Sequence, residues 1–451
     1  MTQQNPYYAI VGLGKTGLSV ARYLAKKNLA FVMMDTRANP PLLNEFLAAF
    51  PNAPLMLDGL SPQHLNAAKE IILSPGLSSQ LPEMQEAQKK GVPIIGDIEI
   101  FARDCTGTII AITGSNGKST VTTLVGLMLA QAGFSVQVGG NLGEPALDLL
   151  HEPPTNFYVL ELSSFQLETT HSLKNHIACI LNITADHMDR YATLNDYIQA
   201  KQRIYQNCQS AIYTLDDKYT VPQMVNTQQD FRFSLHPPQN NNDFGIREQD
   251  HKTYLSCGAQ LLLNVDELKI KGQHNWLNAL AALAIYQAAA KCAEFEPALE
   301  ALKNFAGLAH RCEWVAEQQQ ITWINDSKGT NVGATNAALA GIGQAIAGKI
   351  IWIAGGLGKD ADFSALAPNA ARFVRLAILI GQDAQRLSQT INQFCPYHFA
   401  ENLKQAVITA QQYAQPNDCV LLSPACASFD QFKDFIDRGE QFKLAVKELV
   451  Q

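Results

Sequence analysis

The sequence lacks an excess of positive charge. Its 34 lysines and arginines stand against 41 aspartates and glutamates, which gives a formal net charge of −7. A protein that neutralises nucleic-acid phosphates needs a basic patch or stripe, and this composition does not favour one. We therefore expect no nucleic-acid partner.

Long apolar runs and closely paired cysteines are also missing. No apolar stretch reaches the roughly 20 residues that a membrane helix needs, and the first residues lack the basic and apolar regions of a signal peptide. The nine cysteines are scattered without any C-x-x-C pair. That usage is typical of free thiols in a reducing compartment and not of a disulfide framework or a zinc site. We expect a cytoplasmic protein that is not inserted in a membrane and is a monomer.

The length and the alternation of apolar strands with helices predict the fold class. A chain of 451 residues should form about three domains. We expect an α/β protein with a Rossmann-like domain at 1–96, a central domain at 97–307 and a second Rossmann-like domain at 308–451. The central domain should carry a P-loop ATPase-type parallel sheet, with a small added β-sheet formed by 231–270.

One stretch organises the central domain. An apolar strand, Thr108–Ile112, is followed by a glycine turn and by a helix that opens at Lys118. Backbone N–H groups and the helix dipole at such a turn bind phosphates, a lysine reaches the terminal phosphates, and the next hydroxyl can ligate Mg²⁺. A Gly-Lys-Ser sequence at the start of a helix could simply form a turn without binding a ligand. The loop also differs from the common phosphate loop, because Ile112 stands where that loop has its first glycine. The flanking strand and helix nevertheless favour nucleoside triphosphate binding by Gly114, Ser115, Asn116, Gly117, Lys118, Ser119 and Thr120.

The first domain carries a second glycine loop. Gly12, Gly14 and Gly17 fit G-x-G-x-x-G between a strand and a helix, and Asp35 ends the next strand about 20 residues on. This fingerprint suggests an NAD site. The same geometry serves any ligand with a pyrophosphate and a ribose, including a sugar nucleotide, so both interpretations stay open here.

Two further side chains follow strands of the central domain. Glu161 ends the strand 156–161, where a carboxylate near a phosphate loop suits Mg²⁺. His187 lies in a charged loop after the strand 176–182, which favours a functional role over a structural hydrogen bond.

Three polar residues on predicted helices have less certain roles. Lys201, on the helix 197–205, would by itself be taken for a solvated lysine. Asn275 and Asn278 are one turn apart at the start of a helix, and they could cap it or contact a base or phosphate.

Polar loops follow the strands of the third domain as well. The strand Ile321–Asn325 leads into Asp326, Lys328 and Thr330. Arg311, at the start of this domain, could form a hinge ion pair or contact a terminal phosphate. Ligands of open parallel sheets bind at the carboxyl ends of the strands, so these loops are candidate binding elements.

Together the motifs resemble the Mur ligase family. They cover essentially the whole chain: Thr113–Ser119, Leu160–Gln166, Asp186–Tyr191, Gly272–Asn275, His310 with Arg311, Asn325–Asn331 and Ser423–Asp430. The central motifs are common to the superfamily. The Gly12 loop with Asp35, Thr36 and Arg37, and the segment Ser423–Asp430, resemble its D-glutamate-adding branch.

The resemblance implies an ATP-dependent ligase of peptidoglycan precursor synthesis, with ATP and two Mg²⁺ ions as cofactors. Its substrates would be UDP-N-acetylmuramoyl-L-alanine and D-glutamate. The γ-phosphate would pass to the carboxylate of the L-alanine to give an acyl phosphate, which the amine of D-glutamate would attack, forming ADP and phosphate. The enzyme's task would be positioning and charge neutralisation.

The family pattern also implies roles for individual residues. Lys118 would hold the β- and γ-phosphates, Ser119 and Glu161 one Mg²⁺, and His187 a second. Lys201 falls on a position that is carbamylated in the family, and the carbamate would support that metal. The remaining implied contacts are Asn275, Asn278, Arg311 and Asp326 with ATP, Lys328 and Thr330 near the phosphates and the incoming amino acid, Lys359, Ser428 and Phe429 with D-glutamate, Lys15, Thr16, Asp35, Thr36, Arg37 and Gly76 with the uridine nucleotide, and Asn141 with the sugar-peptide part.

Two alternatives remain. A different ligase of the superfamily could add L-alanine, a diamino acid or glutamate on a folate, although the first-domain loop and Ser423–Asp430 argue against it. An NAD-dependent oxidoreductase would explain the Gly12 loop but leave Gly114–Ser119, Glu161 and His187 without a role.

Overall fold

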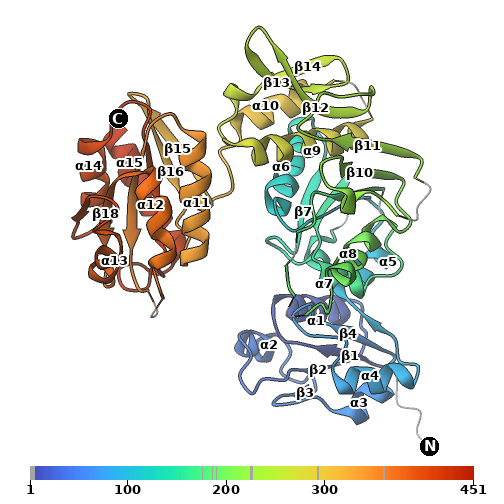
Figure 1. Cartoon of the computed structure of the whole chain (residues 1–451). Coiled ribbons are helices and arrows are strands. Elements are labelled where there is room, and N and C mark those ends of the chain that lie inside the picture. The colour runs from blue at the N-terminus through green and yellow to red at the C-terminus, as the bar shows by residue number, and fades with distance from the viewer. Residues whose placement is uncertain are drawn as a thin grey trace, which may run out of the picture. The chain divides into compact units, whose positions relative to one another are not determined.

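The computed structural model describes residues 6–151, 153–174, 176–184, 186–188, 190–223, 227–291, 294–358 and 361–450 (Figure 1). The chain divides into two compact units. Unit 1 comprises Met1–Leu263 and Leu277–Leu302, and unit 2 comprises Asn264–Trp276 and Lys303–Gln451.

Unit 1 begins with a five-stranded parallel sheet in the order β3-β2-β1-β4-β5. The chain turns from one side of β1 to the other between β3 and β4, so the carboxyl ends of β1 and β4 flank the crevice where doubly wound sheets bind ligands. The elements are β1 (Tyr8–Val11), α1 (Lys15–Lys26), β2 (Phe31–Met34), α2 (Leu43–Ala49), β3 (Leu55–Met56), α3 (Pro62–Ala67), β4 (Glu70–Leu73), α4 (Pro82–Lys89), β5 (Ile94–Ile95) and α5 (Asp97–Asp104).

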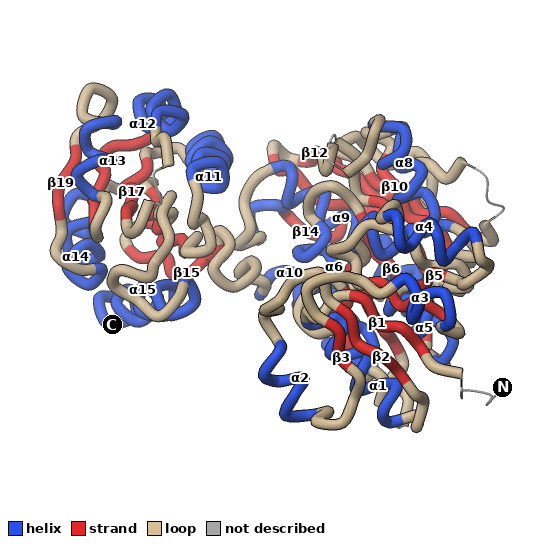
Figure 2. Tube along the Cα trace, turned by 90° about the horizontal axis from the view of Figure 1, so that it is seen from below, coloured by secondary structure: helices blue, strands red, loops and turns tan. Residues whose placement is uncertain are grey.

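Both faces of this sheet are apolar because helices cover both (Figure 2). Ala9 and Val11 on β1 belong to a core that includes Leu65 of α3 and Met84 of α4. Ile10, between them, belongs to another core, which includes residues of α1, α2 and α5. The two-residue period of the strand thus supplies one apolar side chain to each layer in turn.

A nine-stranded sheet forms the centre of unit 1, in the order β14-β13-β12-β11-β10-β9-β6-β8-β7. Its strands are β6 (Thr108–Thr113), β7 (Val136–Gly140), β8 (Phe157–Glu161), β9 (Ile177–Ile180), β10 (Ser210–Thr214), β11 (Gln229–Phe233), β12 (Asp243–Gln249), β13 (Lys252–Cys257) and β14 (Gln260–Asn264). Strands β6 to β12 are parallel to one another, and β13 pairs antiparallel with β12. The small β-sheet predicted for 231–270 takes the form of strands added to one edge of this sheet.

Helices α6 (Lys118–Gln131), α7 (Ser164–Glu168) and α8 (Leu194–Gln202) connect the parallel strands. α7 and α8 each begin with a capping box, in which Ser163 pairs with Gln166 and Thr193 with Asp196. The other helices up to residue 304 are α9 (Gln273–Ala290), α10 (Glu296–Asn304) and the short 3₁₀ helices η1 (Ala146–Leu149), η2 (Arg203–Tyr205), η3 (Lys218–Thr220) and η4 (Val265–Glu267), the last of which belongs to unit 2.

Unit 2 contains a six-stranded sheet in the order β15-β16-β20-β17-β18-β19. β15 pairs antiparallel with β16, and the other pairs are parallel. Its elements are β15 (Glu313–Gln318), β16 (Ile321–Asn325), α11 (Val332–Ala345), β17 (Ile350–Gly355), η5 (Ser364–Leu366), α12 (Ala367–Phe373), β18 (Val374–Ile380), α13 (Ala384–Ile391), β19 (Tyr397–Phe399), α14 (Leu403–Tyr413), β20 (Cys419–Leu422) and α15 (Phe435–Val450).

The sheet of unit 2 is again covered on both faces. Trp352 of β17 packs in a core with residues of α11, α12 and α13, while its neighbours Ile351 and Ile353 pack in a core with residues of α14 and α15. Because β16 and β20 are adjacent and parallel, the loops after them meet at one edge of the sheet. The edge strands β15 and β19 were not predicted from the sequence.

Within the described residues, no helix is long and apolar enough to cross a membrane. The cysteines that the structure describes are all free thiols.

Candidate active site

The phosphate loop follows β6 as the sequence predicts, and α6 begins at Lys118. Gly117 has φ +80°, and a Cβ atom there would lie 2.4 Å from Oδ1 of Asn278, so this position requires glycine on two grounds. Asn182 supports the loop from β9: its carbonyl accepts from the N–H of Ser115 (2.9 Å), and its side-chain Oδ1 accepts from the N–H of Asn116 (2.8 Å).

The loop adjoins a carboxylate at the end of β8. Glu161 is buried, with 2% of its surface exposed. One of its oxygens accepts a hydrogen bond from Oγ of Ser119 (2.7 Å), and the other accepts one from the amide of Asn141 (2.7 Å). The structure therefore brings together the hydroxyl and the carboxylate that the sequence predicts as Mg²⁺ ligands.

Asn141, which donates to Glu161, lines a pocket of about 330 Å³ in unit 1. Five of its lining residues were predicted as site residues from the sequence, namely Gly76, Lys118, Asn141, His187 and Lys201. Its lining residues are Pro75, Gly76, Lys118, Asn141, Ser163, Ser164, Phe165, His187, Tyr197 and Lys201.

Lys201 is the least expected member of this group, because only 2% of its surface is exposed. Its Nζ donates to the carbonyl of Gly114 (3.0 Å) and to Oγ1 of Thr113 (3.2 Å), and it lies 4.7 Å from the ring centroid of Tyr197. Burial, and secondly the positive charge of Lys118, lower the pKa of Lys201 to about 7. A substantial share of this amine is therefore neutral near physiological pH.

Lys118 also points into the loop. Its Nζ donates to the carbonyls of Gly114 (2.9 Å) and Ser115 (3.0 Å). Burial lowers the pKa of Lys118, although the carboxylates of Glu161 and Asp186 act in the opposite direction. The two lysines share the Gly114 carbonyl, which concentrates cationic side chains where phosphates would bind.

His187 lies in the turn after β9 with φ +56°, an uncommon conformation for a residue with a side chain. Its carbonyl accepts from the N–H groups of Arg190 and Tyr191. Its ring centroid is 4.9 Å from that of Phe165, and its Nε2 lies 3.6 Å from Oδ2 of Asp186. The turn thus presents the imidazole at the pocket.

The Ser119 hydroxyl and the Glu161 carboxylate suit Mg²⁺ better than they suit a metal that is bound entirely by protein side chains. Among the described residues, no group of three or more His, Cys, Asp or Glu side chains could hold a metal. Mg²⁺ is usually bound by one or two carboxylates, waters and substrate phosphates, and Ser119 with Glu161 offers that kind of partial site.

The first glycine loop lies at the crevice between β1 and β4. Oγ of Ser74 donates to the carbonyl of Gly12 (2.9 Å), and a Cβ at Gly17 would lie 1.9 Å from that same oxygen. Lys15 and Thr16 form the first turn of α1, and Gly76 follows β4. These predicted residues therefore share one edge of the sheet.

Asp35 fixes the next loop. It is buried and accepts hydrogen bonds from the N–H of Leu13 (2.7 Å) and from the backbone and guanidinium of Arg37 (2.8 to 2.9 Å). Burial alone would raise the pKa of Asp35, but these hydrogen bonds outweigh it and hold the pKa below its ordinary value. The carboxylate is therefore ionised and ties Arg37 to the glycine loop, while Thr36 is exposed.

In unit 2 the loops after β16 and β20 are joined. Asp326 accepts from Oγ of Ser423 (2.7 Å) and from the N–H of Cys312 (3.2 Å). Burial raises the pKa of Asp326 to about 6. Lys328 lies 5.2 Å from the ring centroid of Phe435, and its pKa is lowered by burial and by Arg311.

The remaining predicted residues of unit 2 differ in exposure. Ser428 is buried and Phe429 is 64% exposed, both in the loop after β20, and Thr330 lies in the loop after β16. Asn275, in the first turn of α9, donates its amide N–H to the carbonyl of Lys271 (2.9 Å). Lys359 lies outside the described residues.

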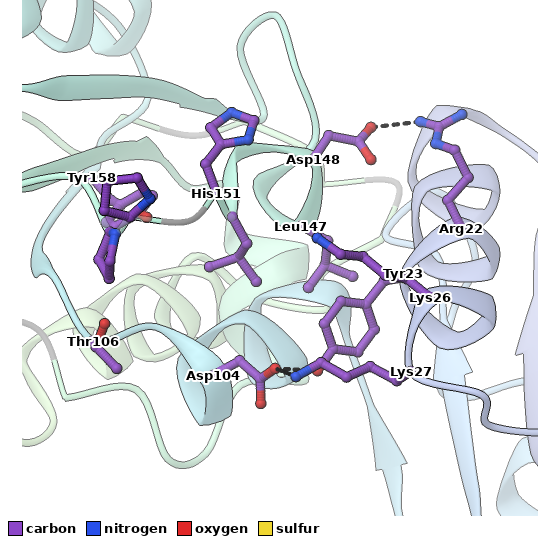
Figure 3. A pocket seen from close by; sticks show the side chains of 13 residues that line it. Arg22, Tyr23, Lys26, Lys27, Asp104, Thr106, Leu147, Asp148, His151 and Tyr158 are labelled. Atoms are coloured by element: carbon purple, nitrogen blue, oxygen red, sulfur yellow. Dashed lines mark hydrogen bonds and ion pairs between the residues drawn. The ribbon is translucent and has the colours of Figure 1, made fainter.

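A second cavity of unit 1, of about 560 Å³, contains none of the predicted site residues (Figure 3). Its charged side chains include two ion pairs: Arg22 with Asp148, and Lys27 with Asp104, each at 2.6 Å. Tyr23 also donates to Asp104 (2.7 Å). These contacts join α1 to the central part of unit 1.

Comparison with known families agrees with this geometry. The models described as Mur ligase MurD-like, N-terminal domain, Mur ligase middle domain, and Mur ligase, glutamate ligase domain match residues 7–96, 112–286 and 310–426. The chain belongs to the Mur ligase family.

Individual relatives within the family match along nearly the full chain. A UDP-N-acetylmuramoylalanine–D-glutamate ligase of Legionella pneumophila is 48% identical over 98% of this chain and 99% of its own length. The enzyme of the same name from Coxiella burnetii is 48% identical over 98% of both chains. A solved structure of a UDP-N-acetylmuramoyl-L-alanyl-D-glutamate–2,6-diaminopimelate ligase aligns with a TM-score of 0.61 at 18% identity, covering 100% of this chain and 97% of that chain, and shares the fold.

Several residues of the site were missed in the sequence. The sequence pattern places Tyr197 on the apolar face of its helix, yet its hydroxyl lies 3.1 Å from Oγ of Ser115 and its ring covers Lys201. The spacing of four residues between Tyr197 and Lys201 on one helix was the available signal. Phe165 lies in the first turn of α7, two residues after the capping Ser163, a context that gave no indication of its contact with His187.

Proposed function

We propose that this Mur ligase family member joins D-glutamate to UDP-N-acetylmuramoyl-L-alanine with hydrolysis of ATP to ADP and phosphate. The full-length relatives at 48% identity carry that activity in their names. The observation that carries the proposal is the arrangement in unit 1. The phosphate-loop lysine, Asn141, His187 and the buried Lys201 line one pocket. Asn141 donates to Glu161, which also accepts a hydrogen bond from Ser119.

The pocket supports activation of a carboxylate by phosphoryl transfer. A carboxylate oxygen is a poor leaving group, so it must first become an acyl phosphate. Lys118 would neutralise charge on the transferred phosphoryl group, and the N–H groups of the loop would hold the phosphates in line. The amine of D-glutamate then attacks the carbonyl carbon and forms the C–N bond. The tetrahedral intermediate collapses as its C–O bond to phosphate breaks, phosphate leaves with the bonding electron pair, and the nitrogen loses a proton to solvent.

Two Mg²⁺ ions would supply charge neutralisation at this pocket. Ser119 and Glu161 would hold the first, and His187 the second. Lys201 would support the second ion as its carbamate. The neutral amine is the form that adds CO₂, so the lowered pKa of Lys201 favours this modification, which replaces a cation by an anion beside the metals.

Unit 2 would contribute residues that bind ATP and residues that bind the amino acid. Asn275, Arg311 and Asp326 would contact ATP, together with Asn278 of unit 1. Lys328, Thr330, Lys359, Ser428 and Phe429 would place D-glutamate, whose two carboxylates require cationic or hydroxyl partners.

The first glycine loop would bind the uridine nucleotide, not NAD. Lys15, Thr16, Asp35, Thr36, Arg37 and Gly76 would hold the uridine diphosphate, and Asn141 the sugar-peptide part. Gly76 and Asn141 line the same pocket as Lys118, which supports delivery of the substrate's carboxylate to the phosphates.

The test is phosphate release from ATP and Mg²⁺ with UDP-N-acetylmuramoyl-L-alanine, in parallel reactions with D-glutamate, L-glutamate, L-alanine or no amino acid. Release that requires both the sugar nucleotide and D-glutamate is expected. Release with another amino acid instead would support ligase activity but overturn the proposed specificity for D-glutamate. Absence of release in every reaction would overturn the ligase.

Two broader properties accompany this function. Both nucleotide substrates are cytoplasmic metabolites, so we place the reaction in the cytoplasm. We also propose that the protein acts as a monomer. Light scattering of the purified chain would test the second point, and a dimer at working concentrations would overturn it.

A further inference from the structure

An arginine outside the predicted site joins two of its loops. Arg190 lies in the loop between β9 and α8, three residues after His187. Its Nη1 donates to the carbonyl of Pro75 (2.8 Å), and its Nη2 donates to the carbonyl of Leu77 (3.0 Å). Both carbonyls belong to the loop after β4 in the first sheet. The side chain is 18% exposed.

The two carbonyls flank Gly76, which lines the pocket with Lys118, Asn141 and His187. A guanidinium holds both ends of this short loop at once, because its N–H donors form a rigid planar fork. Arg190 therefore fixes the position of a pocket wall without lining the pocket.

The guanidinium is itself held in place by side chains of helix α7. It stacks on the ring of Phe165, 3.8 Å from the centroid, and its Nη2 lies 3.5 Å from Oε2 of Glu168. The hydroxyl of Tyr191 donates to Oε1 of Glu168. Phe165 and Glu168 both belong to α7, so Arg190 is braced by one helix.

The same brace reaches His187. The ring of Phe165 contacts both the His187 imidazole and the Arg190 guanidinium. The backbone N–H of Arg190 donates to the carbonyl of His187 (2.9 Å). The loop after β4 and the turn that presents His187 are thus connected through a single side chain and one aromatic ring.

We infer that Arg190 is a positioning residue that sets the sugar-nucleotide loop Pro75–Leu77 relative to the His187 turn. This inference rests on the proposed function, because it assigns the loop after β4 to the sugar nucleotide. Arg190 touches no reacting atom. Its effect is to place the substrate's carboxylate against the phosphates, and small displacements of bound reactants are costly in rate.

The test is steady-state kinetics of the full chain with Arg190→Lys, which keeps the charge but loses the fork. We expect the KM for the sugar nucleotide to rise and kcat/KM for it to fall by about tenfold or more, with the KM for ATP changed by less than about twofold. Arg190→Met should also raise the KM for the sugar nucleotide more than the KM for ATP, and it should lower kcat/KM for the sugar nucleotide further than Arg190→Lys does. Thermal unfolding of each variant separates this effect from misfolding.

Arg203→Lys is the matched control. Arg203 also donates to two backbone carbonyls, those of Leu167 (2.7 Å) and Thr170 (2.8 Å), but both lie in the central part of unit 1. The Arg203→Lys substitution should leave the KM for the sugar nucleotide unchanged. Equal effects of both substitutions, or equal rises in the KM for ATP and for the sugar nucleotide, would overturn the positioning role.

The proposed function and this inference fail separately. If the unmodified chain does not ligate D-glutamate, the proposed function is wrong whatever the variants do. If it does, and Arg190→Lys keeps the kinetic constants of the unmodified chain, only the role of Arg190 is wrong.

Discussion

Lys201 illustrates what the sequence can and cannot reveal about a single residue. Its helix pattern predicts a solvated lysine, and only the family resemblance marked the position. The structure instead buries the amine against the Gly114 carbonyl and the Tyr197 ring. Burial of a charged side chain depends on the loop that packs over it, and that loop comes from a segment more than 80 residues away, so helix periodicity could not reveal it.

We predict that Lys201→Ala is nearly inactive and is partly rescued by short carboxylic acids. An added carboxylate would occupy the cavity left by the side chain and replace the anion of a carbamate. Phosphate release in the presence and absence of acetate measures the rescue. Ordinary activity of Lys201→Ala without acetate would contradict the carbamate role.

The buried amine also predicts a pH-dependent stability. The folded pKa of Lys201, about 7, lies below that of the unfolded chain. The cost of burying the charged amine is therefore complete below about pH 7 and is relieved as the pH rises toward the unfolded pKa. In CO₂-free buffer, Lys201→Met should be more stable than the unmodified chain at about pH 6, and this gain should shrink by about pH 10. Denaturant unfolding at both pH values measures it, and a gain independent of pH would contradict the assigned pKa.

Glu161 supports a prediction about the metal. Glu161→Gln can still accept from Ser119, but it loses the negative charge that Mg²⁺ requires. We expect the Mg²⁺ concentration for half-maximal activity to rise by about tenfold or more, with lower kcat. Glu144→Gln, an exposed glutamate in the loop after β7, is the control and should leave the Mg²⁺ dependence unchanged. An unaltered Mg²⁺ dependence in Glu161→Gln would remove this residue from the metal site.

At the scale of elements, periodicity predicted the interior better than the edges. The strand β16 and the start of α6 at Lys118 lie where the sequence predicts them, because each has an apolar run with clear turn residues beside it. The apolar pattern places the start of the first helix at Leu18, whereas α1 begins at Lys15 and therefore includes Gly17. The edge strands β15 and β19 carry mixed polar residues, and their pairing is set by neighbouring strands, so their own sequences gave no signal.

The glycine loop of α1 gives a prediction at this scale, because Gly14 and Gly17 differ in their surroundings. A Cβ at Gly17 would lie 1.9 Å from the Gly12 carbonyl, whereas at Gly14 no atom lies within 4 Å. Gly17→Ala should destabilise unit 1 by about 2 kcal/mol or more, because α1 must move away from β1. Gly14→Ala should cost less than about 1 kcal/mol and act mainly on sugar-nucleotide binding.

Thermal unfolding and calorimetric titration with the sugar nucleotide separate these two effects. Equal stability of the two variants would mean that the packing of α1 on β1 tolerates a methyl group at Gly17.

At the scale of the whole molecule, the family and its three matched segments agree with the fold class predicted from the alternation of strands and helices. The domain boundaries at 96/97 and 307/308 stay a prediction. The residues from 264 to 276 belong with the C-terminal residues in unit 2, a distant association that local composition does not encode.

The division into two units predicts where each ligand should protect the backbone. The proposed sugar-nucleotide residues lie in unit 1, and the proposed D-glutamate residues lie in unit 2. A ligand stabilises the region that binds it, by about 2.7 kcal/mol at a concentration 100 times its Kd. Hydrogen exchange of the full chain should therefore slow around 12–17, 35–37 and 74–77 with UDP-N-acetylmuramoyl-L-alanine alone. Exchange around 326–330 and 423–429 should slow only when D-glutamate and a non-hydrolysable ATP analogue are added. If D-glutamate protected the first glycine loop instead, the assignment of substrates to the two units would be reversed, because local protection follows the contacts that a ligand makes.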